Sequence, residues 1–370
     1  MPPPATPAKL VLLRTAETLS IAAAGGVVLA WLGFPAGLVT GSLLAVAVAA
    51  LAGRPVTVPA ALSRAISVLV GISLGAVVTP ATIKGLAAFP LSLAVLVVST
   101  LCMLAATATY LRVVHGWDRQ SALLGASPGG LAQVMVLAAE FKADLRAIAI
   151  VQTVRVVALT LGIPAGLALF GLAASGGVMM RLGSAPASIA ELTILVVVST
   201  ALALAIWGLR LPGGLLFGSM LGSGVLHGFG WIDSTLPWWV AGAAVIGIGA
   251  MTGSRFAGTH PRTLLRFLGA ALGSFAVALS VASVFVLLLA TLLSVPVADA
   301  VVAFAPGAQD TMMVLALALH LDPVFVGALH LSRFLLVSLL VPFLAHRLQQ
   351  GPPKPRRERP PDTGRPTIED

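Results

Sequence analysis

The stretch GASPGGLAQ at residues 125–133 decides how this chain folds, because proline and paired glycines interrupt an otherwise apolar helical segment. A degenerate copy, APGAQD, stands at residues 305–310. Around the two stretches, residues 127–164 align without a gap with residues 305–342, so each position of the first segment recurs in the second at a constant spacing. The chain therefore contains an internal duplication centred on two breaks.

The informative matches are those that a hydrophobic composition does not supply by chance. The chain is 58% hydrophobic and 9% charged, so apolar matches carry little weight. Four other matches carry more: Pro128-Gly129 with Pro306-Gly307, Asp144 with Asp322, Arg155 with Arg333, and Pro164 with Pro342. Similar pairs outside this core extend the duplication over most of the chain, which predicts one membrane repeat at residues 15–180 and a second at 181–346.

The composition predicts an all-α integral membrane protein. Mean hydropathy is +1.03, and apolar stretches of about 18 or more residues recur along the chain. Such segments are helical because the bilayer offers no partner for backbone N–H and C=O groups. We expect the lipid bilayer as a partner and no direct contact with nucleic acid. The proline-rich residues 1–14 and the basic residues 347–370 are predicted to be disordered, the latter as a cytoplasmic tail.

Lysine and arginine positions choose the topology. If twelve apolar segments all span the membrane, the cations of the loops divide evenly between the two sides. If segments 120–140 and 300–318 are instead re-entrant hairpins, each half has five spans and the halves are inverted. Twelve cations then lie on the inner side: Lys9, Arg14, Arg54, Arg64, Arg112, Arg119, Lys142, Arg146, Arg210, Arg255, Arg262 and Arg266. Only Lys84 and Arg181 lie outside.

Because cationic loops stay inside, the bias favours about ten transmembrane helices plus two re-entrant hairpins, arranged as two inverted repeats of five spans. It also predicts a multi-pass protein of the bacterial inner (plasma) membrane with both termini in the cytoplasm. The alternative is that each segment is one kinked but continuous span.

Two arginines are placed near the middle of the bilayer by this topology. Arg155 lies roughly 12 Å and Arg333 roughly 15 Å from the start of its span, at about 1.5 Å per residue, within a core about 30 Å thick. Arginine holds carboxylate or phosphate with two donors, and helix N-termini favour anions. The alternative is a structural role, in which each arginine binds the carbonyl ends of a broken helix.

The predicted site combines both arginines with the two hairpin tips. Its substrate-binding residues are Arg155, Arg333, Ser127, Pro128, Gly129, Gly130, Gln152, Pro306, Gly307 and Gln309. Asp310 and His330 are candidates for coupling to a proton or a sodium ion. For Asp310 a plain ion pair with Arg333 is the favoured interpretation, and for His330 a satisfied packing residue is the commoner one. Ser127 before proline is suited to start a new helix, and Asp144 and Asp322 are predicted N-caps.

Several chemistries lack support in the sequence. There is no G-x-x-x-x-G-K-[ST] loop, so ATP does not drive the protein by that route. The six histidines show no metal-binding spacing and Cys102 is alone, so neither a metal site nor another cofactor is predicted. We expect no enzymatic activity. Oligomeric state is undetermined, with a homodimer left open.

The two Pro-Gly segments resemble those of the duplicated membrane family known as AbrB, over nearly the whole chain. Members are often labelled putative ammonia monooxygenase or AbrB-family regulator, which implies a role in oxidation or in regulating gene expression. Ala308 departs from the fuller Pro-Gly-Gly form of the first half.

From the residues themselves, we expect secondary transport of a small anionic solute, because duplicated halves with broken helices are typical of such carriers. A membrane-embedded regulator that acts on gene expression indirectly is the alternative, and a membrane monooxygenase is the least supported.

Overall fold

The computed structural model describes residues 8–78, 89–128, 131–172, 188–209, 213–293 and 295–349, and all regular secondary structure in these ranges is helical. The helices of the first half are α1 (Ala8–Trp31), α2 (Gly37–Leu51), α3 (Ala60–Gly75), α5 (Phe89–His115), α6 (Arg119–Ala126), α7 (Leu131–Glu140) and α8 (Leu145–Leu169). Those of the second half are α9 (Ile189–Gly208), α10 (Gly214–Gly228), α11 (Trp238–Gly253), α12 (Pro261–Leu293), α13 (Val297–Phe304), α14 (Gln309–Ala318) and α15 (Pro323–Gln349).

Six of these helices are long and apolar enough to cross a membrane, namely α1, α5, α8, α9, α12 and α15. The α8 segment is an interior helix, with 72% of its most apolar window buried, whereas α9 has 17% buried and faces outward. Large apolar side chains such as Trp31 and Ile189 are exposed on the outer helices. Since water would not favour so much exposed apolar surface, this pattern is typical of helices that face lipid.

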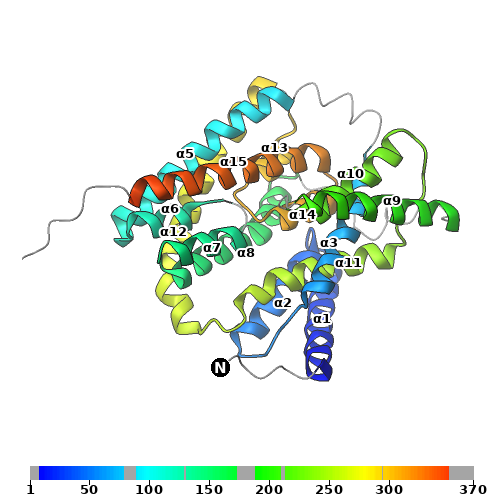
Figure 1. The fold of residues 1–370 in the computed structure, drawn as a ribbon, viewed down its shortest axis with the longest axis horizontal. Coiled ribbons are helices and arrows are strands. Elements are labelled where there is room, and N and C mark those ends of the chain that lie inside the picture. The colour runs from blue at the N-terminus through cyan, green and yellow to red at the C-terminus, as the bar shows by residue number, and fades with distance from the viewer. Residues whose placement is uncertain are drawn as a thin grey trace, which may run out of the picture.

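The helices form two bundles that both draw on the two halves of the chain (Figure 1). The crossed bundle consists of α1, α2, α3, α9, α10 and α11. The hairpin bundle consists of α5 to α8 and α12 to α15, in which α12 packs along α5 and α8. Neither half therefore forms a separate domain.

Glycines set how closely the crossed bundle packs. In this bundle α3 packs against α10 and α11 packs against α2, so helices of the two halves contact each other directly. A Cβ atom at Gly249 of α11 would lie 2.5 Å from the Ser42 Cβ and 2.8 Å from the Val39 carbonyl oxygen of α2. A Cβ atom at Gly71 of α3 would collide in the same way with Ser219 and the Leu216 carbonyl of α10. Such contacts are characteristic of small residues at membrane helix interfaces.

The termini differ from the sequence-based boundaries. Residues 8–14 belong to helix α1 rather than to a disordered segment, and residues 347–349 continue helix α15. The apolar and helix-favouring residues around Lys9 and Arg14 let α1 begin earlier than the apolar run suggests. Residues 1–7 and 350–370 lie outside the described residues, as do Lys84, Arg181 and Arg210.

Candidate functional site

The first predicted hairpin consists of two short helices, α6 and α7, whose outer ends lie next to each other. Helix α6 ends at Ala126, and α7 runs from Leu131 to Glu140, so the segment is broken rather than continuous. The Ser121 hydroxyl near the start of α6 accepts a hydrogen bond from the Asp144 backbone N–H, beyond the end of α7, at 3.0 Å. The chain therefore enters and exits this hairpin at the same place.

The second hairpin repeats this geometry at the equivalent positions. Helix α13 ends at Phe304 and α14 begins at Gln309. The Asp299 carboxylate accepts a hydrogen bond from the Asp322 N–H at 2.7 Å, in the place of the Ser121 and Asp144 contact. At the mouth of each hairpin, where the chain enters and leaves it, a side chain of the first helix thus accepts a hydrogen bond from the backbone N–H of the residue that caps the next long helix.

The N-caps predicted from the sequence are confirmed in both halves. Asp144 accepts hydrogen bonds from the backbone N–H groups of Arg146 and Ala147 at 3.1 and 3.0 Å. Asp322 accepts from Val324 and Phe325 at 2.9 and 3.1 Å. These caps satisfy N–H groups that a helix leaves unpaired, and they fix where α8 and α15 start.

Each buried arginine holds the broken end of the neighbouring hairpin helix. Arg155 Nη2 donates to the Ser127 carbonyl oxygen at 2.8 Å, and Nη1 donates to that of Ala126 at 3.3 Å. Arg333 donates in the same way to the carbonyl oxygens of Ala305 and Ala303. The structural role that the sequence left open is therefore present, because the guanidinium groups satisfy carbonyls that α6 and α13 leave unpaired.

Gln152 and His330 bind equivalent backbone carbonyl oxygens in the two halves. Gln152 Nε2 donates to the Leu124 carbonyl oxygen at 3.0 Å, and His330 Nε2 lies 3.0 Å from the Val302 carbonyl oxygen. Each side chain is one helical turn before its arginine and is buried. Since an uncharged amide serves in the first half, a neutral imidazole with its proton on Nε2 suffices in the second.

The two guanidinium groups retain unused donors. Arg155 and Arg333 are 3% and 2% exposed. Within the described ranges, their Nε atoms and the Ser127 hydroxyl are buried without a hydrogen-bond partner. The two cations also lie close enough to repel each other. In the described part of the chain the one ion pair is Arg54 with Glu17, far from this site in sequence and exposed, so neither buried arginine has a carboxylate partner there.

Asp310 does not pair with Arg333, so the predicted ion pair is wrong. Arg333 is held by backbone carbonyls of its own hairpin, while the Asp310 carboxylate interacts electrostatically with the half-buried Arg255. Arg255 lies in the 3₁₀ turn η3 (Ser254–Phe256) between α11 and α12; burial lowers the pKa of its guanidinium, and the Asp310 charge opposes that shift.

The remaining tip residues contact the crossed bundle or lie at the break. The amide of Gln309 occupies the space that a side chain at Gly213 would need, and the Thr311 hydroxyl is 3.2 Å from that of Thr252. Pro128, Pro306 and Gly307 are buried at the two breaks. Gly129 and Gly130 lie outside the described residues.

Ser127 is not the N-cap of a new helix. It is the C-cap residue of α6, because α6 ends at Ala126 and α7 does not start until Leu131. The proline at 128 ends α6 but does not begin α7. Sequence reasoning placed the break correctly and assigned the serine to the wrong side of it.

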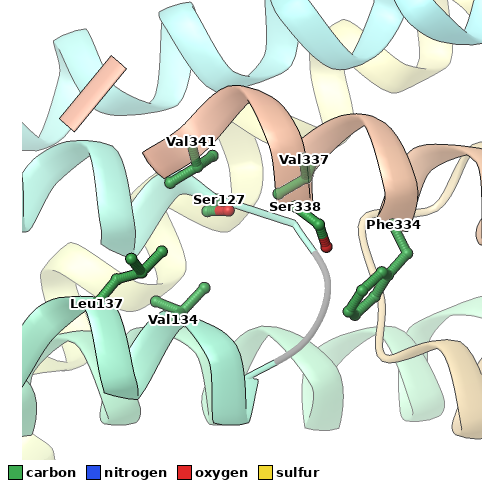
Figure 2. Close-up of a pocket in the computed structure, with 7 residues that line it drawn as sticks. All are labelled: Ser127, Val134, Leu137, Phe334, Val337, Ser338 and Val341. Carbon is green, nitrogen blue, oxygen red and sulfur yellow. The ribbon is translucent and has the colours of Figure 1, made fainter. Parts of the chain in front are cut away.

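A cavity of about 10 Å³ lies between the first hairpin and α15, with room for about one water-sized group. Figure 2 shows its lining side chains facing one another from the two segments. They are Ser127, Val134, Leu137, Phe334, Val337, Ser338 and Val341. Apart from Ser127, sequence reasoning missed these residues, since apolar positions in an apolar helix carry no signal of their own.

The carboxyl group of Asp299, at the mouth of the second hairpin, has a raised pKa. Asp299 is outside the six candidate spans; burial raises the pKa of its carboxyl group, the Asp322 N–H lowers it, and the Asp322 charge raises it again. A raised pKa means that the folded state binds the proton more tightly than the unfolded state, so stability falls as pH rises from the ordinary value of 3.8 through the raised pKa.

We expect Asp299→Ser, which places the serine of position 121 at the equivalent site, to keep the hydrogen bond from the Asp322 N–H. The variant should not lose stability as pH rises through this range. Thermal unfolding of the purified protein across pH would measure it. Parallel pH profiles of variant and wild type would contradict the prediction, and Ser121→Asp should introduce the dependence at the first mouth.

Comparison with known proteins identifies similar chains over most of the sequence. Residues 38–349 match the model of the family described as Transition state regulatory protein AbrB. The chain is 27% identical over 368 residues to the Uncharacterized protein YhjN of Bacillus subtilis (strain 168), covering 91% of this chain and 94% of the relative. It is also 27% identical over 340 residues to the Putative regulator AbrB of Escherichia coli (strain K12), covering 86% and 92%. The resemblance seen in the two Pro-Gly segments is thereby confirmed, and this chain belongs to the AbrB family.

Proposed function

We propose that this protein is a secondary transporter of a small anionic solute, which binds between the two hairpins. The observation that carries the proposal is the pair of buried guanidinium groups of Arg155 and Arg333, each with a free Nε–H and no carboxylate partner in the described ranges. Each binds carbonyls at a helix C-terminus, which carries at most about half a negative charge. Those carbonyls therefore leave a surplus of positive charge for an anion to neutralise.

The hairpin ends add to this attraction. The break that exposes carbonyls at the end of α6 also opens the N-terminus of α7, and α14 begins after the second break. Helix N-termini offer unpaired N–H groups and a partial positive charge. A charged side chain in a membrane interior is costly, at about 2.5–3.5 kcal/mol on insertion scales, and two at equivalent positions point to a use.

The proposed topology has ten spans, with the hairpins re-entrant and the halves inverted. The six long helices are joined by α2, α3, α10 and α11, whose 15 or 16 residues measure about 22–24 Å. Helices shorter than the hydrocarbon core are accommodated by local thinning of the bilayer. Both termini lie in the cytoplasm, and the membrane is the bacterial inner membrane.

Side-chain pairs support this sidedness, because each joins residues predicted on the same side. Aromatic contacts link Trp117 with Phe267 at 6.4 Å and Phe141 with His346 at 5.0 Å, all on the inner side. On the outer side, the Ser234 hydroxyl donates to Glu191 at 2.6 Å. Alternating access would then move the hairpin bundle against the crossed bundle.

Cysteine labelling tests the inverted arrangement. Positions 142 and 320 follow α7 and α14 at equivalent points, and Cys102 is the single native cysteine. In a Cys102→Ala background, Lys142→Cys should react with a membrane-impermeant maleimide from the cytoplasmic side and His320→Cys from the opposite side. Reaction of both from one side would contradict inverted halves.

Anion flux tests the function itself. We expect the protein reconstituted in liposomes to take up at least one small anion, and Ser127→Ala to slow that uptake several-fold because its buried hydroxyl is lost from the site. Ser73→Ala is the matched control, since the Ser73 hydroxyl bonds the Leu69 carbonyl oxygen within its own helix in the other bundle. Equal fluxes in wild type, Ser127→Ala and protein-free liposomes would count against a transporter.

A regulator that acts through ligand binding is the second candidate, favoured by the name of the Escherichia coli relative, Putative regulator AbrB. It shares the anion site but predicts binding without flux. Anion-dependent stabilisation of a protein that moves no anion would therefore favour the regulator.

A further inference from the structure

The cavity between the first hairpin and α15 has a filled counterpart in the other half. In the alignment of the two repeats, its lining positions correspond to Ala305, Met312, Leu315, Val156, Leu159, Thr160 and Ile163, all of which are buried. The side chain of Met312 packs against the break, because a Cβ atom at Gly307 would lie 2.7 Å from its Cγ. Where the second hairpin carries this methionine, the first has Val134.

Three lining positions on α15 are also smaller than their counterparts on α8. Val337 stands opposite Leu159 in the alignment, Ser338 opposite Thr160, and Val341 opposite Ile163. Phe334 is larger than its counterpart Val156, and among the lining residues it is the one that is clearly larger than its counterpart. Since interiors pack to high density, the smaller side chains are the physical reason for a cavity on this side.

The walls of the cavity suit a group without charge. Five of its seven lining side chains are hydrocarbon, and the polar ones are two hydroxyls. The Ser127 hydroxyl is fully buried and has no hydrogen-bond partner among the described residues, while Arg155 binds the carbonyl of the same residue. Arg333 precedes Phe334 on α15 and lies one helical turn before Val337. Arg155 is thus joined to the cavity through Ser127, and Arg333 stands next to a lining residue on α15.

An anion that uses this arrangement has a charged end and a short apolar end. A carboxylate bonds the guanidinium donors and the Ser127 hydroxyl, while one small carbon group, close to a water molecule in size, enters the cavity. Sulfate or phosphate would place charged oxygens against hydrocarbon walls, which costs free energy without a compensating hydrogen bond.

We propose that the cavity receives the apolar end of a short-chain carboxylate whose charged end is held between Arg155 and Arg333. The proposal rests on the anion site of the proposed function and adds the class of solute.

Thermal unfolding of the purified full chain in detergent, with sodium salts at equal ionic strength, tests the class of solute. We expect acetate to raise the midpoint at concentrations at least ten-fold lower than sulfate requires. Equal responses to sulfate and acetate, both weakened in Ser127→Ala, would overturn the carboxylate inference and leave the anion site standing. No response to any of these anions would count against the anion site as well.

Repeat-swap variants test the cavity. Val134→Met places in the first hairpin the residue that the second accommodates, and should weaken the acetate response at least ten-fold with little change of the midpoint without ligand. Met312→Val is the matched control and should keep the wild-type response. If Val134→Met does not fold, Val341→Ile, which copies Ile163, makes the same test. An undiminished acetate response in a folded cavity-filling variant would overturn the proposal.

Discussion

Arg333→Met is expected to abolish stabilisation by anions and to lower the free energy of unfolding by about 2 kcal/mol, within the range for a buried polar group that loses its partner. The variant keeps the volume of the side chain but leaves the carbonyl oxygens of Ala303 and Ala305 unpaired in a buried place. Removal of one of two buried charges that repel each other offsets part of this cost.

His330→Gln is the matched control for this variant. Gln152 shows that an amide makes the corresponding hydrogen bond, so the hairpin should keep its stability and its anion response. Unfolding curves with and without a saturating anion measure both effects, since a ligand at about 100 times its Kd stabilises by about 2.7 kcal/mol. An Arg333→Met protein with an undiminished anion response would rule out the guanidinium as a ligand.

The His330→Gln variant also separates anion binding from proton coupling. If His330 carries the coupled proton, His330→Gln should still bind the anion while its flux no longer responds to a pH gradient. If coupling lies elsewhere, for example at Asp310, flux in this variant follows pH as in the wild type.

Gly249→Ala is expected to destabilise the crossed bundle by about 1–3 kcal/mol, the usual cost of extra volume in a packed interior. The added methyl group would lie 2.5 Å from the Ser42 Cβ and 2.8 Å from the Val39 carbonyl oxygen, so helices α11 and α2 must separate. Gly71→Ala should have the same effect on α3 and α10, because its neighbours there are also backbone and Ser219.

The control is Gly162→Ala on α8, where a Cβ atom would meet no other heavy atom within 4 Å. Its stability should match or slightly exceed the wild type, since alanine favours a helix over glycine by about 1 kcal/mol. Midpoints of thermal unfolding in one detergent would rank the variants. Equal midpoints for Gly249→Ala and Gly162→Ala would show that α2 and α11 do not pack as closely as the structure has them.

Local chemistry explains which predictions succeeded. Proline removes a backbone donor wherever it stands, so the breaks near Pro128 and Pro306 could be placed from the sequence. Aspartate directly before a helix caps it by a local hydrogen bond, so Asp144 and Asp322 could be assigned as well. The ion pair expected between Asp310 and Arg333 is absent because Arg333 is held by the backbone carbonyls of its own hairpin. The cation whose pKa the Asp310 charge raises, Arg255, is distant in sequence.

Composition and contacts between near neighbours were enough to predict the helical membrane character, the duplication, the two breaks and the two equivalent arginines. Only the packing of distant segments showed that the arginines bind the broken helix ends, that helices of one half pack against those of the other, and that a cavity opens beside the first hairpin. Those features depend on which distant segments meet and how much volume their side chains fill. An apolar sequence leaves both open, because its helices could pack on one another in many ways.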